Sequence, residues 1–270
     1  MILQKGEGYF MFYAVWLEGQ LVWNMPLLAG LMCVGALYSF ILLSFTNIKI
    51  HHQQPLLFFL CLVIIYVTIG SPLSDISHLS FSLHMIQMSI LFFIIPPLFL
   101  LGIPDSFPEI IKGLNRLFLP PKAALYTFAV LFLLYHLPVV LTFLSQNSFV
   151  HNGYLFVLLV MSFSMWRPIV KGQNKRYAFL SGLLLLPACT LLILTAFIGG
   201  LNNPLLTQMT ATLCISPSDL SSLNILPYPF NTKFDQIMAG FLMMGMHKLA
   251  LFVTVRIGKK VQVHDWGRNG

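Results

Sequence analysis

Long runs of apolar residues constrain this chain more than any other feature. Only 9% of its 270 residues are charged, which is too few to cover a soluble domain. Seven of the runs approach the roughly 20 residues that an α-helix needs to cross a bilayer. They lie at about 21–46, 55–73, 79–101, 122–145, 151–167, 179–200 and 235–257. We therefore predict an all-α, polytopic membrane protein in which seven transmembrane helices contact the lipid bilayer.

The remaining segments are short, with one exception. Residues 1–20 are rich in aromatic side chains and lack the pattern of a signal peptide, so we interpret them as an N-terminal interfacial segment. The seven-helix domain then covers residues 21–257 and includes a long outer loop at 199–234. We expect residues 258–270 to form a cytoplasmic tail. The four cysteines show no CxxC spacing, so neither a disulfide framework nor a zinc site is supported.

Positive charge is distributed unevenly between the two sides of the predicted bundle. Most of the 15 lysines and arginines lie in the loops after the first, third and fifth runs and in the tail, whereas the opposite side has only Lys5 and Lys233. Because cytoplasmic loops carry an excess of lysine and arginine, we predict that the N-terminus is outside and the C-terminus cytoplasmic. No dense basic run occurs despite the formal charge of +7, so we expect no nucleic-acid partner.

Groups that can bind a soft metal collect in the outer part of this topology. His84 lies near the start of the third run, and Met88 lies one turn deeper on the same helical face. His136 lies about 13 Å below the outer end of the fourth run. The seventh run contains several methionines and His247. Imidazole and thioether together suit Cu(I) better than magnesium or calcium. We therefore predict a copper site formed by His84 and Met88, with further histidines as additional ligands.

Three polar residues lie nearer the predicted outer surface. Asp75 and His78 belong to the second loop, and Asp235 opens the seventh run. The two carboxylates can draw cations towards the opening of the bundle, and the imidazole of His78 is a candidate further ligand. A purely structural role is the alternative for each candidate, as a hydrogen-bonded packing residue for the histidines and as a helix cap for Asp75. Two roles are also possible for Pro96 and Pro97. They either bend the third helix to form a cavity or leave a break that neighbouring helices fill.

Two blocks of the sequence resemble a known family. HMIQMSILFFIIPPLFLLGIP at 84–104 and DQIMAGFLMM at 235–244 are similar to signatures of the CtaG-type caa3 cytochrome c oxidase assembly factors of Gram-positive bacteria. The residues that match are His84, Met85, Gln87, Met88, Pro96, Pro97, Leu98, Gly102 and Pro104, then Asp235, Gln236, Ala239, Gly240 and Met243. Many relatives have a second histidine where this chain has Met88, which favours a mixed site for Cu(I) over a pair of imidazoles.

The resemblance implies a multi-pass protein of the bacterial plasma membrane that binds cytochrome c oxidase subunits. It also implies a non-enzymatic role in supplying copper to the CuA site. The residues fit a transient Cu(I) site of His84 and Met88, completed by His78, His136 or His247. Two alternatives stay open: a transporter or channel for a metal ion or proton, and a haem-binding protein that uses His84, His136 and His247.

Overall fold

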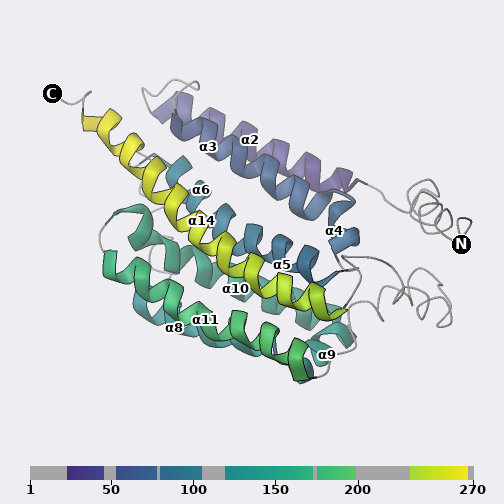
Figure 1. Ribbon diagram of the computed structural model, residues 1–270. Coiled ribbons are helices and arrows are strands. Elements are labelled where there is room, and N and C mark those ends of the chain that lie inside the picture. Colours follow the sequence, from purple (N-terminus) through teal and green to yellow (C-terminus); the bar gives the residue numbers. More distant parts are fainter. Residues whose placement is uncertain are drawn as a thin grey trace, which may run out of the picture.

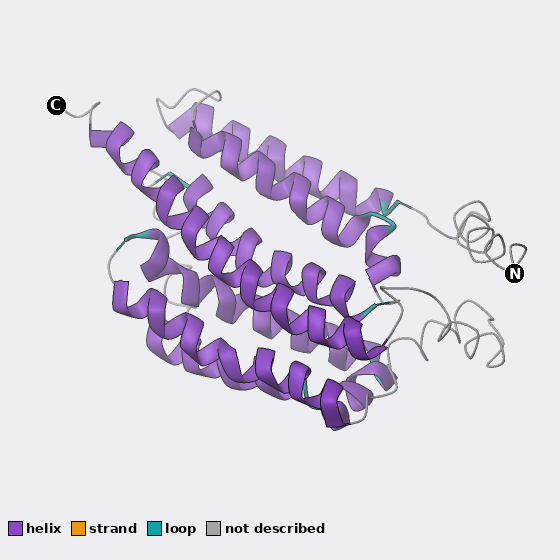
Figure 2. Ribbon diagram, viewed as in Figure 1, coloured by secondary structure: helices purple, strands orange, loops and turns teal. Residues whose placement is uncertain are grey.

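The computed structural model describes residues 23–45, 53–77, 80–104, 119–172, 175–198 and 232–266. Within these ranges all regular secondary structure is helical (Figure 2). Six helical segments there are long and apolar enough to cross a membrane. The predicted all-α, multi-pass class is therefore confirmed, while the seventh span and the orientation of the termini stay predictions. The interfacial segment at 1–20 and nearly all of the outer loop lie outside the described residues.

The helices follow the predicted apolar runs. The first two runs and the loop after them are α2 (Met25–Phe45), α3 (Gln53–Ile65), the π-helical η1 (Tyr66–Gly70) and α4 (Leu73–Ser77). The third run is α5 (Phe81–Ser89), the π-helical η2 (Ile90–Ile94) and α6 (Ile95–Gly102). The last three runs are α10 (Ser148–Val170), α11 (Lys175–Ile198) and α14 (Thr232–Trp266). Helix α14 continues past the predicted start of the tail at residue 258.

The fourth run differs from the prediction of one continuous span. It consists of α8 (Pro121–Tyr135) and α9 (Pro138–Gln146), with His136 and Leu137 between them. A proline has no N–H to continue a helical ladder, and in a continuous helix its ring would clash with the carbonyl of the residue four positions earlier. Position 138 therefore cannot extend α8 as a regular α-helix. Helix α8 alone is about 22 Å long, which is less than the hydrocarbon thickness of about 30 Å. The break places His136 at the end of a helix.

The helices run up and down, and the third apolar run lies at the centre (Figure 1). The window of α5, η2 and α6 is 61% buried, whereas the window of α2 is only 17% buried. Helix α14 packs on α5 and α11, and α10 packs on α8 and α6. Helix α3 covers the opposite side of α6, and α2 is attached outside it. Of the described segments, α5, η2 and α6 thus form the interior of the bundle, and the helices around them can shield polar groups there from lipid.

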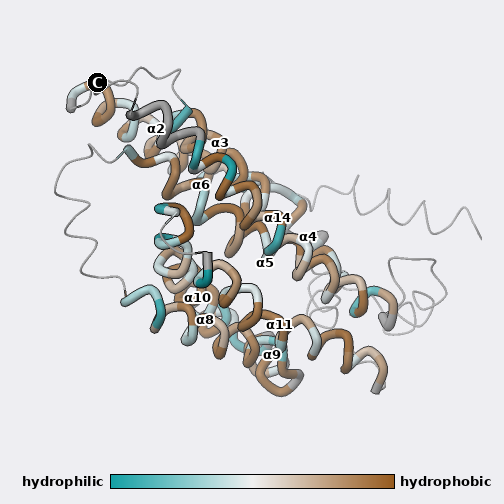
Figure 3. Tube along the Cα trace, turned by 60° about the vertical axis from the view of Figure 1, so that its left-hand side comes forward, coloured by the Kyte–Doolittle hydropathy of each residue, from teal (hydrophilic) through white to brown (hydrophobic). Residues whose placement is uncertain are grey.

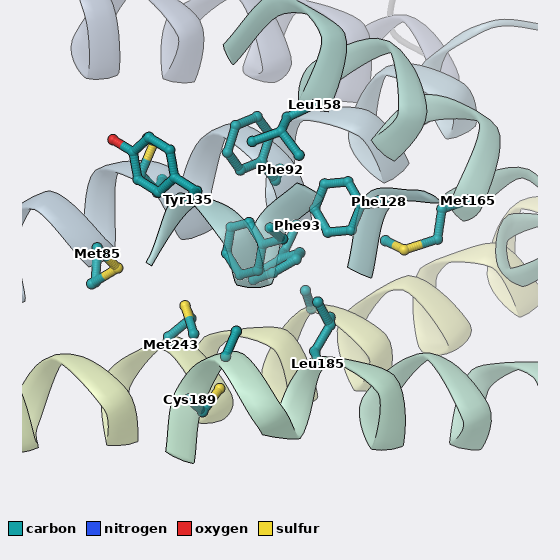
Figure 4. Close-up of a cluster of buried hydrophobic side chains, with 14 of the residues drawn as sticks. Met85, Phe92, Phe93, Phe128, Tyr135, Leu158, Met165, Leu185, Cys189 and Met243 are labelled. Carbon is teal, nitrogen blue, oxygen red and sulfur yellow. The ribbon is translucent and has the colours of Figure 1, made fainter. Parts of the chain in front are cut away.

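Aromatic side chains fill the core around the third run (Figure 4). Phe92 and Phe93 are fully buried, and each packs edge-on against Phe128 and Phe132 of α8. The carbonyl of Phe92 accepts hydrogen bonds from Ser162 Oγ and from Trp166 Nε1, the latter at 3.0 Å. Of the two interpretations of the proline pair, the filled break is therefore the one that the structure supports at this point.

The outer surface of the bundle is apolar and its interior holds the polar groups. Large hydrophobic side chains point outward, with Phe149 at 90% and Phe179 at 75% exposure. Figure 3 shows long apolar stretches, in brown, along the helices. By contrast, His84, Asp235 and His247 are each exposed by 3% or less. This distribution is the one expected where lipid surrounds the protein, because an unsatisfied polar group is costly in hydrocarbon.

Candidate soft-metal site at one end of the bundle

A buried carboxylate fixes the end of the bundle where α5 and α14 both begin. Asp235 accepts hydrogen bonds from Ser80 Oγ at 2.7 Å, from the Phe81 amide at 2.5 Å and from the Ser82 amide at 3.0 Å. The Ser82 hydroxyl donates to the same carboxylate at 2.5 Å. A carboxylate is favourable here because the first amides of a helix lack partners and carry partial positive charge. Asp235 therefore holds the first turn of α5 against α14.

The residue Gln87 fixes the same segment from its other side. Its amide donates to the carbonyl of Thr68 at 3.0 Å, and its side-chain oxygen accepts from Ser77 Oγ at 2.5 Å. These bonds attach α5 to η1 and α4. Asp235 and Gln87 thus position the first turns of α5, including His84 and Met85, from two sides.

His136 and Met85 bring two atoms that can bind a soft metal close together. His136 Nδ1 lies 2.6 Å from the carbonyl oxygen of Phe132. Because that carbonyl only accepts, Nδ1 carries the proton, and the other nitrogen of a neutral ring holds a lone pair. That nitrogen, Nε2, lies 3.3 Å from Met85 Sδ. Both residues are almost completely buried, at 4% and 3% exposure. An imidazole nitrogen and a thioether sulfur therefore face each other inside the bundle.

Two further histidines meet at the hydroxyl group of Tyr135. His84 Nε2 lies 2.9 Å from this hydroxyl oxygen, and His151 Nε2 lies 3.2 Å from it. A hydroxyl group has one proton to donate, so when it bonds both rings, one nitrogen accepts and the other donates. The two imidazoles consequently have different protonated nitrogens, or one of them is charged. Tyr135 is itself 1% exposed and separates the two rings.

The predicted ligands are only partly brought together. His84 and His136 both contact Tyr135, and Asp235 binds the residues just before His84. Met88 is 2% exposed in the hydrophobic cluster that also contains Met85. His247 lies about 18 Å along α14 from Asp235 and packs on Phe93, with ring centroids 4.9 Å apart. His78 and the side chain of Asp75 lie outside the described part of the chain. Among the described residues, no three His, Cys, Asp or Glu side chains are grouped as a metal site.

Sequence periodicity missed Met85, which directly follows His84. Helical spacing pairs a residue with the one four positions later, so it pointed to Met88. Neighbouring residues instead point about 100° apart around a helix, because one turn takes about 3.6 residues. His84 therefore contacts Tyr135, while Met85 contacts His136. The tandem His-Met in the signature block was the available signal, but only the neighbouring helix shows what each side chain meets.

The comparisons with known proteins give one result for the whole bundle. The model of the cytochrome c oxidase caa3 assembly factor family matches residues 36–257. This range includes every described helix in full except α2 and α14, which it covers in part. Searches of curated proteins and of solved structures gave no match. The match covers most of the chain and confirms the resemblance seen in the two sequence blocks, so the chain belongs to the caa3 cytochrome c oxidase assembly factor family.

Proposed function

We propose that this protein holds Cu(I) transiently and passes it on during assembly of the CuA site of a caa3-type oxidase. The observation that carries the proposal is the contact between His136 Nε2 and Met85 Sδ. Both atoms offer electron pairs when the ring is neutral, and neither then supplies a proton to the other. A soft cation between them would turn this contact into a binding site, and the combination of thioether and imidazole selects Cu(I).

The separation of the two atoms is compatible with a shared metal ion. With bonds of about 2.0 Å to nitrogen and about 2.3 Å to sulfur, a separation of 3.3 Å corresponds to an angle of about 100° at the metal. That angle leaves space for one or two further ligands. Methionine has a flexible side chain and can widen the angle without moving the backbone. We propose His84 and Met88 of α5 as the further ligands.

The other predicted residues take different parts in this proposal. Asp75 and His78 would receive the ion near the outer surface, in the plasma membrane orientation derived from the charged loops. Asp235 contributes by holding α5 in place and leaves the metal to its neighbours, since its oxygen atoms already accept several hydrogen bonds. His247 lies too deep to join the site at His136. A site with two firm ligands and two exchangeable ones suits a cargo that must leave again.

Binding of Cu(I) to purified variants tests the proposal. The full-length protein in detergent would be titrated without oxygen against a chromogenic Cu(I) chelator. We expect Met85→Leu and His136→Leu to weaken binding at least tenfold, because each removes one ligand with little change in volume. Met165→Leu is the matched control, since Met165 is equally buried but lies at the opposite end of the cluster in Figure 4. Wild-type affinity in both ligand variants would refute the proposed site.

The link to the oxidase needs a measurement in cells. A strain that carries His136→Leu should assemble a caa3 oxidase with less copper at CuA, whereas the Met165→Leu strain should match the wild type. The measurement is the copper content and activity of the purified oxidase, at equal abundance of the assembly factor. Normal CuA content in the His136→Leu strain would separate this protein from copper delivery, even if it binds the ion in solution.

A further inference from the structure

A cavity of about 270 Å³ lies between α11 and α14, deeper in the bundle than the proposed copper site. Its walls come from these two helices and from Phe93 and Phe132. Neither His136 nor Met85 lines it. Figure 4 labels four of the lining residues, Phe93, Leu185, Cys189 and Met243, where α11 and α14 face the aromatic cluster. The cavity therefore calls for an explanation other than copper transfer at the outer end.

The walls suit a flat aromatic molecule. Three phenylalanine rings line the cavity, those of Phe93, Phe132 and Phe179. The other lining residues are mainly leucine, alanine and methionine, and Lys248 is the one charged residue among them. An apolar cavity of about 150 Å³ is large enough to bind benzene. The present cavity is larger, so it has room for a ring with substituents. Aromatic rings pack favourably in offset or edge-on contacts, which these walls can provide.

One buried polar atom beside the cavity lacks a partner. His247 lines the cavity and is 3% exposed, and its Nε2 makes no hydrogen bond to any residue that the structure describes. Buried polar atoms almost always have a hydrogen-bond partner. The ring packs between Phe93 at 4.9 Å and Trp166 at 6.0 Å, measured between centroids. A half-turn of the ring about χ2 exchanges Nε2 with Cε1, the ring atom nearest to a Cβ on Gly182, and turns Nε2 towards the cavity. An oxygen atom of a bound ligand would then supply the partner that the surrounding aromatic rings do not.

The wall of the cavity that α11 provides includes two exposed residues. Phe179 and Leu183 line it and are 75% and 51% exposed. Gly182 lies between them and also lines the cavity. A Cβ atom placed on Gly182 would meet only the Cε1 atom of His247, at 3.9 Å, among the described atoms. The missing side chain at position 182 therefore leaves space between the lipid and the imidazole.

We propose that this cavity binds a lipid-soluble quinone or the corresponding phenol. The ring lies among the three phenylalanines, and its oxygen shares a hydrogen bond with His247 Nε2. A neutral imidazole can donate to a quinone carbonyl or accept from a phenol hydroxyl, depending on its protonated nitrogen. The hydrocarbon tail leaves between Phe179 and Leu183 into the bilayer. This site is independent of the proposed copper function and requires no metal.

Quenching of tryptophan fluorescence tests the proposal, because Trp166 lies beside His247. The metal-free, full-length protein in detergent would be titrated with a decyl-substituted 1,4-benzoquinone. We expect saturable quenching in the wild type, at least tenfold weaker binding in Gly182→Leu, which fills the cavity, and several-fold weaker binding in His247→Leu. Gly245→Leu is the control: it adds the same atoms to an exposed site of α14 where a Cβ meets nothing within 4 Å.

The outcomes separate binding in the cavity from general partitioning into detergent. Quenching that rises without saturation, or equally in all four proteins, would overturn the proposal. It would also fail if Gly182→Leu and Gly245→Leu bound the quinone equally well or equally poorly. Each protein must elute as a single species with wild-type thermal stability before it is titrated. Cu(I) binding should be unchanged in Gly182→Leu, so failure of this inference leaves the copper proposal untouched, and the reverse also holds.

Discussion

Asp235 shows what a single residue can contribute that its sequence position does not reveal. Its place at the start of the last apolar run made it a candidate to attract metal ions. In the structure it is 3% exposed and accepts hydrogen bonds from three residues at the start of α5, more than 150 positions earlier in the chain. The sequence can show that a carboxylate lies at the start of its own helix. It does not show that the carboxylate accepts hydrogen bonds from the first turn of a helix in a distant part of the chain.

Replacing Asp235 by asparagine should destabilise the protein more than removing any one of the side-chain hydroxyl groups that donate to it. Asparagine keeps the shape but presents an amide group in place of one accepting oxygen, so a buried backbone amide of α5 loses its partner. Hydrogen bonds to charged groups contribute about 1.5–3 kcal/mol each. Ser82→Ala removes one hydroxyl donor and should cost less. Thermal unfolding in detergent measures both, and an unchanged midpoint for Asp235→Asn would contradict the capping role.

The residues of the copper proposal illustrate the same limit. Sequence reasoning identified His84, Met88 and His136 because ionisable and thioether groups are rare enough inside an apolar run to be noticed. It did not single out the contacts of Met85 and Tyr135, since a methionine or tyrosine in such a run is usually a packing residue. Only the contact between α5 and the end of α8 shows that Met85 faces His136 and that Tyr135 lies between His84 and His151.

Among the elements, the proline pair in the third run has a definite structural consequence. In an α-helix the carbonyl of Phe92 would accept from residue 96, and in a π-helix from residue 97, but both are prolines without an N–H. Helix α10 supplies the missing donors through Ser162 and Trp166. The sequence of the third run predicts the break, whereas the side chains that compensate for it are on another helix and have no local signal.

A double-mutant cycle on α10 measures this compensation. Ser162→Ala or Trp166→Phe alone leaves the Phe92 carbonyl with one donor, so the hydrogen-bonding loss should be about 1 kcal/mol beyond any packing loss. The double variant leaves a buried carbonyl without any donor and should cost more than the sum of the two, by about 1 kcal/mol or more. Unfolding free energies of the four proteins give the coupling. Strict additivity would mean that the two donors act independently of the break.

At the scale of the whole molecule, hydropathy was enough to predict the fold class. Each helix satisfies its own backbone hydrogen bonds, so a run of apolar residues determines a span without information from the rest of the chain. The fourth run was the exception, because its apolar character hid the effect of Pro138 on the helix. The orientation of the bundle depends on the charges of the loops, several of which lie outside the described residues. The orientation therefore remains a prediction.

Reporter fusions on either side of α10 test both the orientation and the broken fourth span. Asn147 precedes α10 and Gly172 follows it. If α8 and α9 together cross the membrane, and the cation-rich loops are cytoplasmic, alkaline phosphatase fused after Asn147 should be active and the same fusion after Gly172 inactive. Green fluorescent protein should give the opposite pattern. Active phosphatase at Gly172 and inactive enzyme at Asn147 would show that the bundle has the opposite orientation. His84, Met85 and His136 would then lie on the cytoplasmic side, away from the outer face where the proposed delivery to CuA requires them.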